Sequence, residues 1–155
     1  MVSFRKFRDS DFEIMLKWLQ EPHVKEWWDD GDDTIEKVTG HYSRDPDVVS
    51  RYILLSDLNL PIGYFQFYLE SGNVVGIDQF IGDKTLLNRG VGTEAIKNFL
   101  SMIYDEINPA TVVVDPEPSN RRAIRCYEKV GFRYAELSVG EDGKEAYLMR
   151  MDRDV

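Results

Sequence analysis

A titratable side chain precedes a glycine-rich turn in this sequence. Asp78 lies in the apolar stretch 74–81, and Gly90-Val-Gly92 follows it after a short loop. Glycines let backbone N–H groups approach a bound group closely, and the first turn of a helix favours an anion. The spacing therefore predicts a phosphate-bearing cofactor beside a titratable side chain.

The stretch 62–69 could contribute a second set of ligand contacts. Alternation along a strand places its side chains on two faces: Tyr64, Gln66 and Tyr68 on one, Phe65, Phe67 and Leu69 on the other. Aromatic rings with polar groups suit a wet pocket for a sugar-like or cationic ligand. A strand with a half-exposed outer face would show the same alternation, so both interpretations stay open.

Charged side chains gather in two places. An acidic segment includes two adjacent tryptophans: Trp27, Trp28, Asp29, Asp30, Asp32 and Asp33. It could stack on and neutralise a polyamine, whereas a solvated loop with one buried tryptophan explains the individual aspartates. A basic group stands out in the acidic chain: Arg121, Arg122, Arg125 and Lys129. It favours phosphate contacts, and a solvated helix face is the alternative.

Spacing argues against three other kinds of site. The segment 90–95 fits the loose dinucleotide pattern G-x-G-x-x-A, with Asp115 about twenty residues further on. That pattern directly follows the first strand of a βαβ unit, whereas here a loop separates strand and glycine. No G-K-[ST] follows, which excludes a Walker loop. His23 and His41 have no carboxylates at metal-ligand spacing, so we expect no metal.

An α+β domain would position these residues. Apolar patterns predict strands at 2–7, 51–56, 62–70, 74–81, 111–115, 134–137 and 146–151. Helices are expected after a cap at Asp9 or Ser10, after Thr34, from Val91 onward and over 120–130. The first should bury Phe12, Met15, Leu16 and Leu19 and stop at Pro22. The third has an apolar stripe at Ile96, Phe99, Leu100, Ile103 and Ile107. This order predicts a mixed, mostly antiparallel sheet flanked by helices in one domain, 1–155.

Composition narrows the partners. The chain has 155 residues, 43% of them hydrophobic, and a formal net charge of -9. The negative charge argues against nucleic acid and is compatible with a cationic small molecule. No segment has the apolar length of a signal peptide or a membrane span, and Cys126 is the only cysteine. We therefore expect a cytoplasmic protein that does not bind membranes.

Several segments resemble known acyltransferases. The segment Leu87-Asn-Arg-Gly-Val-Gly-Thr93 resembles the acyl-CoA pyrophosphate loop of the GNAT superfamily, usually written Q/R-x-x-G-x-G/A, with leucine where Gln or Arg is common. The element order resembles theirs over essentially the whole chain. Three segments are similar to aminoglycoside 6′-N-acetyltransferases: Gly76-Ile-Asp-Gln79, Val114-Asp-Pro-Glu-Pro-Ser-Asn120 and Arg122-Ala-Ile-Arg-Cys-Tyr-Glu-Lys-Val-Gly-Phe132. The connection from Tyr68 to Gly76 is shorter than the acidic, aromatic insertion associated with that family.

The resemblance implies a GNAT-like fold and an acetyl-CoA-dependent acetyltransferase. It assigns the acyl donor to Phe80, Ile81, Arg89, Gly90, Val91, Gly92, Thr93, Asn120 and Ala123. It assigns the acceptor to Trp27, Tyr42, Tyr64, Gln66, Gln79 and Asp115. Asp78 would be the general base, with Asp115 the next candidate, and Tyr127 would assist the departing thiolate. A backbone N–H near Ile81 would polarise the thioester oxygen.

The implied acceptor is the 6′-amine of an aminoglycoside, bound by a monomer or homodimer. Two alternatives remain open. The first is an acetyltransferase for a metabolic amine, such as a polyamine or a siderophore hydroxylamine. The second is an acyl-CoA-binding module without turnover. The presence of Asp78 and Tyr127 favours an enzyme.

Overall fold

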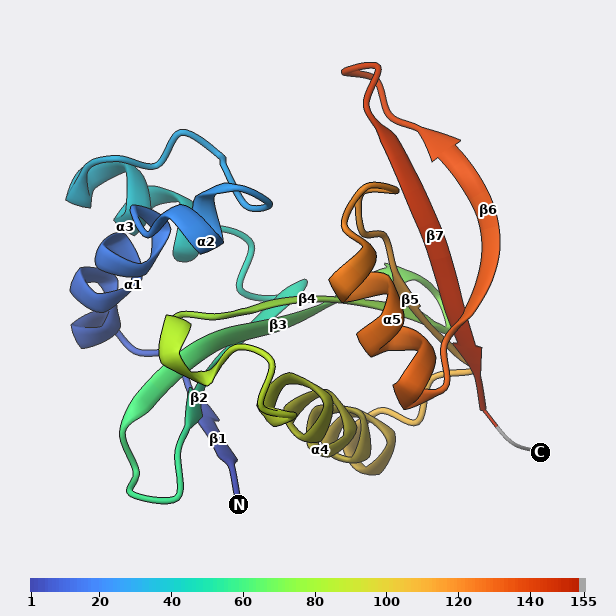
Figure 1. Ribbon diagram of the computed structural model, residues 1–155, viewed down its shortest axis with the longest axis horizontal. Helices are drawn as coiled ribbons and strands as arrows, with labels where there is room; N and C mark the ends of the chain where they lie inside the picture. The colour runs from blue at the N-terminus through green and yellow to red at the C-terminus, as the bar shows by residue number, and fades with distance from the viewer. Residues whose placement is uncertain (154–155) are drawn as a thin grey trace.

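The computed structural model describes residues 1–153, in which seven strands form a single sheet (Figure 1). The strands are β1 (Ser3–Lys6), β2 (Val49–Leu55), β3 (Pro61–Ser71), β4 (Val74–Ile81), β5 (Thr111–Val114), β6 (Arg133–Val139) and β7 (Glu145–Asp152). Their order is β1-β2-β3-β4-β5-β7-β6, and among these described strands only β4 and β5 are parallel neighbours. The predicted mixed, mostly antiparallel sheet is confirmed.

Five α-helices accompany the sheet over the same residues. They are α1 (Phe12–Leu19), α2 (Pro22–Lys25), α3 (Ile35–Tyr42), α4 (Val91–Glu106) and α5 (Arg121–Val130), with short 3-10 turns at Asp9–Asp11 and Lys84–Leu86. The sequence pattern does not predict α2, because it treats Pro22 only as a stop for α1. Proline is also favoured at the first position of a helix, and Pro22 begins α2. No helix within residues 1–153 is both long and apolar enough to cross a membrane.

The two faces of the sheet carry separate apolar cores. α4 and α5 pack on one face, against side chains such as Phe65, Phe67 and Val112. α1, α2 and α3 pack on the other face, around Tyr64. Figure 1 shows these three helices gathered at one end of the sheet, while the β6–β7 hairpin rises past α5 at the other. The predicted alternation in β3 is confirmed, although Leu69 near its end is exposed.

The start of α1 differs from the prediction. Neither Asp9 nor Ser10 caps the helix. Instead the Asp11 carboxylate accepts hydrogen bonds from the Arg8 backbone N–H and from two guanidinium nitrogens of Arg5, each at 2.8 Å. Burial alone would raise the pKa of Asp11, but these donors outweigh burial and hold that pKa below its usual value. A buried ion pair therefore joins β1 to the start of the first helix.

Two buried helix faces also need correction. α1 buries a different set of side chains from the predicted one: Met15, Trp18 and Leu19. Phe12 and Leu16 are only half-buried. The predicted stripe of α4 ends at Ile103, because Ile107 lies beyond the helix and is 41% exposed. The Thr34 cap of α3 is confirmed, since its side chain accepts the Lys37 N–H at 3.2 Å.

Candidate active site

The divergence of β4 and β5 forms the centre of the site. The two strands pair only where 74–76 lies beside 111–113. β5 then ends at Val114, whereas β4 continues to Ile81. Within the described residues, β4 beyond Gly76 has no strand on that side. We call this side of β4, from Ile77 to Ile81, the opening.

Alternate residues of β4 present their backbone to the opening. The Gly82 N–H donates to the Ile62 carbonyl of β3 at 2.8 Å, and successive residues of a strand direct their backbone groups to opposite neighbours. Phe80 therefore directs its backbone to β3, whereas Gln79 and Ile81 direct theirs to the opening. Gln79 and Ile81, and not Phe80, therefore present backbone groups to the opening, which corrects the predicted backbone contact through Phe80.

His23 on α2 reaches the same opening. Its Nε2 lies 2.9 Å from the Ile81 carbonyl oxygen, which can only accept, so Nε2 carries the hydrogen. Its Nδ1 is buried and has no hydrogen-bond partner among residues 1–153. From the sequence, His23 was considered only as a possible metal ligand. Its contact with Ile81 could not be predicted, because no spacing rule relates α2 to the end of β4.

Asp78 lies beside the opening and faces the side of the sheet covered by α1 to α3. It is the cross-strand partner of Gln66, whose Nε2 donates to the Asp78 carboxylate at 3.2 Å. Burial raises the pKa of Asp78 to about 7, the charge of Asp115 adds to the rise, and the Gln66 hydrogen bond opposes it. A carboxylate that titrates near neutral pH is suited to act as a general base.

Asp115 follows the last residue of β5, across the opening from Asp78. It is exposed to solvent, yet partial burial and then the charge of Glu70 raise its pKa. The two diverging strands thus each deliver one carboxylate. Because like charges disfavour ionisation, Asp115 helps to keep the Asp78 pKa high.

Tyr127 approaches from α5, on the opposite face of the sheet. Its hydroxyl accepts a hydrogen bond from Gln79 Nε2, and its ring packs edge-on against Phe132. Burial raises the pKa of Tyr127 and the charge of Asp78 raises it further, so the hydroxyl stays protonated at neutral pH. Gln79 neighbours Asp78 along the strand and therefore points to the other face. We correct its predicted place on the acceptor side accordingly.

The glycine turn contains two glycines of different kinds. Gly90 has φ of +79°, a left-handed conformation that favours glycine. At Gly92, which has no such φ, a Cβ would meet only Cys126 Sγ, at 4.0 Å. Packing within the described residues therefore leaves open space beside the Gly92 backbone. The N–H groups of Val91, Gly92 and Thr93 have no partner within the helix, so this space suits an anion.

The other predicted donor residues lie around the starts of α4 and α5. Asn120 caps α5, since its side-chain oxygen accepts the Ala123 N–H at 3.3 Å, which leaves its amide N–H groups for another partner. Thr93 Oγ1 lies 3.3 Å from Cys126 Sγ and so links the first turn of α4 to α5. Several arginines near these helix starts are exposed: Arg89, Arg121, Arg122 and Arg125.

The predicted acceptor residues divide into buried and accessible ones. Tyr64 is 0% and Tyr42 3% exposed, and the Tyr42 hydroxyl accepts from Trp28 Nε1 at 3.0 Å. Neither tyrosine is therefore exposed to a ligand in this structure, because α1 to α3 cover that face of β3. Trp27 is 38% exposed and Gln66 half-buried, so both are accessible.

The loop between α2 and α3 concentrates negative charge. His41 Nδ1 lies 2.6 Å from the Asp32 carboxylate and 3.9 Å from that of Asp30. Ligand-type atoms of all three lie within 4.8 Å of one another, a grouping that sequence spacing did not predict because the fold carries His41 to the loop. Asp30 also raises the pKa of Asp78. Negative charge thus extends from the opening to this loop, and the His41 ion pairs account for the grouping.

Known proteins share this arrangement. Residues 8–138 match the family described as Acetyltransferase (GNAT) domain. A Klebsiella pneumoniae protein named aminoglycoside N(6′)-acetyltransferase type 1 is 30% identical over 168 residues, covering 96% of this chain and 82% of that protein. A Rhizobium radiobacter protein named kanamycin resistance protein is 35% identical over 77 residues, covering 50% of this chain and 71% of that protein.

Solved structures agree with the sequence comparisons. The crystal structure of the aminoglycoside acetyltransferase AAC(6′)-Ib in complex with coenzyme A and kanamycin has a TM-score of 0.89 at 30% identity, over 99% of this chain and 95% of that one. The match therefore includes the diverging strands, the glycine turn and α5. Since the family match spans most of the sequence and the fold agrees over nearly all of it, this chain belongs to the GNAT acetyltransferase family.

Proposed function

We propose that this protein transfers the acetyl group of acetyl-CoA to the 6′-amine of an aminoglycoside. The observation that carries the proposal is the position of Asp78. It is a carboxylate with a pKa of about 7 beside the opening between β4 and β5. The names of the relatives, aminoglycoside N(6′)-acetyltransferase and kanamycin resistance protein, support the acceptor.

The residues around the opening fit acetyl-CoA, which supplies an acetyl group as a thioester. The backbone N–H and carbonyl of Gln79 and the N–H of Ile81 face the opening and can hold an extended arm of the donor, in the manner of an added strand. The open space at Gly92 and the first-turn N–H groups of α4 suit its pyrophosphate. The exposed Arg89 lies just before α4, and Asn120 caps the start of α5.

Three groups would then share the chemistry. Asp78 accepts one proton from the acceptor ammonium, which frees the nitrogen lone pair to attack the thioester carbon. A backbone N–H of Gln79 or Ile81 stabilises negative charge on the carbonyl oxygen while the C–N bond forms. As the C–S bond breaks, the Tyr127 hydroxyl donates to the sulfur, and the second amine proton restores that hydroxyl. No acyl-enzyme is needed, so Cys126 has only a packing role.

The acidic surroundings select a cationic acceptor. Asp115 lies at one side of the opening and Asp30 of the α2–α3 loop at the other, and both add negative charge at Asp78. Trp27 is exposed near this loop and offers a face on which a sugar ring or an ammonium group can stack. An amine-rich aminoglycoside matches this combination.

The experiment that tests the proposal follows release of free thiol from acetyl-CoA against several acceptors. We expect turnover with kanamycin and little with an analogue that carries a hydroxyl at the 6′ position, because a hydroxyl has no ammonium proton for Asp78 to take. Spermidine and a lysine-containing peptide serve as competing acceptors. Turnover confined to spermidine or the peptide would overturn the aminoglycoside assignment. Tight acetyl-CoA binding without thiol release would indicate a binding module.

A further inference from the structure

Polar side chains form a row across three strands and end at Asp78. Arg51 on β2 is the cross-strand partner of Gln66 on β3, which is in turn the partner of Asp78 on β4. Cross-strand partners share one face of a sheet, and Tyr64, two residues before Gln66, shares it too. This face is otherwise covered by the aromatic core under α1 to α3.

Hydrogen bonds join three members of this row, Tyr64, Gln66 and Asp78. The Tyr64 hydroxyl donates to Gln66 Oε1 at 2.6 Å, and Gln66 Nε2 donates to Asp78 Oδ2 at 3.2 Å. An amide has an accepting end and a donating end. Because the hydroxyl hydrogen occupies the accepting end, the donating end is left for Asp78.

Arg51 lies on the same face of the sheet as Tyr64, and its positive charge acts on the Tyr64 hydroxyl. Burial raises the pKa of Tyr64 strongly, and the charge of Arg51 opposes that rise. A guanidinium has donors only, so the Tyr64 O–H cannot donate to Arg51 and is left to donate to Gln66. The guanidinium is held in turn, since its Nη2 donates to the Arg44 carbonyl at 2.7 Å.

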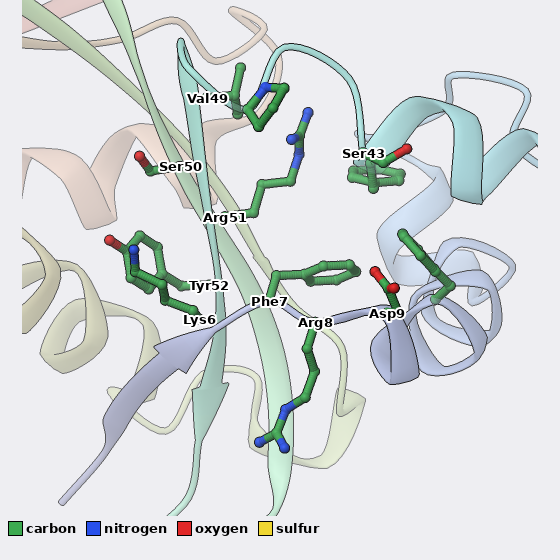
Figure 2. A pocket seen from close by; sticks show the side chains of 12 residues that line it. Lys6, Phe7, Arg8, Asp9, Ser43, Val49, Ser50, Arg51 and Tyr52 are labelled. Carbon is green, nitrogen blue, oxygen red and sulfur yellow. The ribbon is translucent and has the colours of Figure 1, made fainter.

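The cavity in Figure 2 shows how Arg51 is placed. Its side chain leaves β2 on the same side as Phe7, whereas Ser50 and Tyr52 point to the other side. Arg51 lines this cavity of about 320 Å³, and its Nε is buried with no hydrogen-bond partner in the described part of the chain. The charge is therefore partly desolvated and lies beside backbone carbonyls at the end of α3.

The ring of Tyr64 is fixed by its neighbours. Four rings surround it with centroids within 6.0 Å: Phe7, Trp28, Tyr42 and Phe80. Since Tyr64 has no exposed surface, it cannot touch either substrate. Any effect on the reaction must pass through its hydroxyl to Gln66.

We propose that Tyr64, Gln66 and the neighbouring cation Arg51 are positioning residues. The hydrogen bonds from Tyr64 to Gln66 and from Gln66 to Asp78 form a one-directional hydrogen-bond chain, which keeps an amide N–H pointed at Asp78 and so holds the base oriented and ready to accept a proton. The proposal rests on the proposed function in that Asp78 is the base. Without the hydrogen bond from Tyr64, the Gln66 amide is free to turn its carbonyl oxygen toward Asp78. That oxygen would repel the ionised carboxylate.

Other charged or titratable groups also act on Asp78. They come from β3, β5, α5 and the α2–α3 loop: Tyr68, Glu70, Asp115, Tyr127 and Asp30. The negative charges of the carboxylates oppose ionisation of Asp78, and Gln66 is the hydrogen-bond donor that favours it. A substitution confined to this hydrogen-bond chain should therefore raise the pH midpoint of the Asp78 titration.

The test uses Tyr64→Phe, which removes the hydroxyl and keeps the ring. We expect a carbon-13 NMR titration of the Asp78 carboxyl in the free protein to shift upward by about one pH unit. In the same variant, kcat/KM for kanamycin should fall about tenfold at pH values well below the midpoint and recover well above it. Gln66→Leu should move both readouts in the same direction. Arg51→Met should do so too, whereas Arg51→Lys, which keeps a donor-only cation, should restore the wild-type values.

The matched control is Tyr52→Phe, which removes a hydroxyl from another buried tyrosine of the same sheet that lies outside the chain. It should leave the Asp78 midpoint unchanged. An unchanged midpoint in folded Tyr64→Phe and Gln66→Leu, with kcat/KM lowered equally at every pH, would overturn the proposal and leave a packing role. The wild type could release no thiol with any aminoglycoside while the Asp78 midpoint still shifted in Tyr64→Phe. That result would support the hydrogen-bond chain and contradict the proposed acceptor.

Discussion

Asp78 and Asp115 are carboxylates from adjacent strands, but their surroundings differ. Asp78 is half-buried beside an amide donor, whereas Asp115 is exposed to solvent and lies near Glu70. Only Asp78 combines a pKa of about 7 with a fixed hydrogen-bond partner. This difference assigns the role of base to Asp78 and a supporting negative charge to Asp115.

We expect Asp78→Asn to lower kcat by roughly a hundredfold or more, the usual scale for positioned proton transfer, with a smaller effect on KM. Activity should partly return as pH rises, because the free amine then accumulates without a base. Steady-state kinetics with kanamycin over a range of pH would measure both effects. Near-normal kcat with a raised KM would make Asp78 a binding residue, and Asp115→Asn would then be the variant to test for loss of kcat.

The same substitution should change the pH dependence of stability. In the unfolded chain Asp78 has its ordinary pKa of 3.8, and in the folded protein its pKa is about 7. As pH rises between these values, the unfolded chain loses its proton first, so the wild type loses stability with rising pH. Asp78→Asn lacks this loss, and we expect its advantage to grow to about 2–4 kcal/mol above pH 7. Thermal unfolding of both proteins from pH 4 to 8 would measure it, and a constant difference in Tm would contradict it.

At single positions, the sequence predicts which face of a strand or helix a side chain occupies better than it predicts how deeply that side chain is buried. The segment 76–79 predicted a carboxylate on β4, and helical spacing with the motif over 122–132 placed Tyr127 on α5. The alternation of side chains along β3 also placed Tyr64 correctly on a different face from Phe65. It could not show that α1 to α3 cover Tyr64, because cover depends on packing between segments distant in the chain. His23 was missed as a contact of Ile81 for the same reason.

The turn into α4 contains two glycines, and only one of them has a backbone conformation that requires glycine. Gly90 has a left-handed φ that favours glycine, whereas Gly92 has no such φ. Among residues 1–153, a Cβ would meet nothing within 4 Å at Gly90 and only Cys126 Sγ, at 4.0 Å, at Gly92, so backbone conformation explains only the first glycine. The sequence shows both glycines, but it does not show which is needed for the fold.

We expect Gly92→Val to weaken acetyl-CoA binding by at least about tenfold, because the added carbons would fill the space beside the first-turn N–H groups. Stability should change by less than about 1 kcal/mol, since valine is at least as good a helix former as glycine. Calorimetry and thermal unfolding would measure the two effects. Gly72→Val is the control, because a Cβ at that exposed turn meets no neighbour within 4 Å among the described residues. Unchanged affinity in folded Gly92→Val would remove this turn from the donor site.

Among elements, long periodic segments were predicted well and short ones were not. All seven strands and the helices α1, α3, α4 and α5 were predicted within a few residues. The single turn of α2 has too few residues to show a period, and Pro22 carries opposite meanings at a helix end and a helix start. The divergence of β4 and β5 could not be predicted from either strand, since it depends on where their pairing stops.

Across the whole molecule, charge of one sign predominates but is unevenly placed. The net charge is -9, and carboxylates surround the opening on the side of Asp78 and the α2–α3 loop. Exposed arginines lie instead on α5 and before α4. The protein therefore presents opposite charges to a cationic acceptor and an anionic donor.

We expect the affinity for kanamycin to fall as salt is raised from low to about physiological ionic strength, where charges more than about 8 Å apart are screened. An aminoglycoside with fewer amines should lose less affinity over the same range, because it forms fewer charge contacts. Calorimetric titration at several salt concentrations measures the slope for each acceptor. Equal slopes for acceptors of different charge would contradict an electrostatic acceptor site.

The opening along β4 is a sheet edge inside the protein, and it should be visible in the exchange of amide hydrogens with solvent. The amides of Asp78 and Phe80 are held by β3, whereas those of Gln79 and Ile81 face the gap. We expect hydrogen exchange in the free protein to alternate along the strand, fast at Gln79 and Ile81 and slow at their neighbours. Coenzyme A should slow only the fast pair. The donor would then act as a removable strand of the sheet, present during turnover and absent between turnovers.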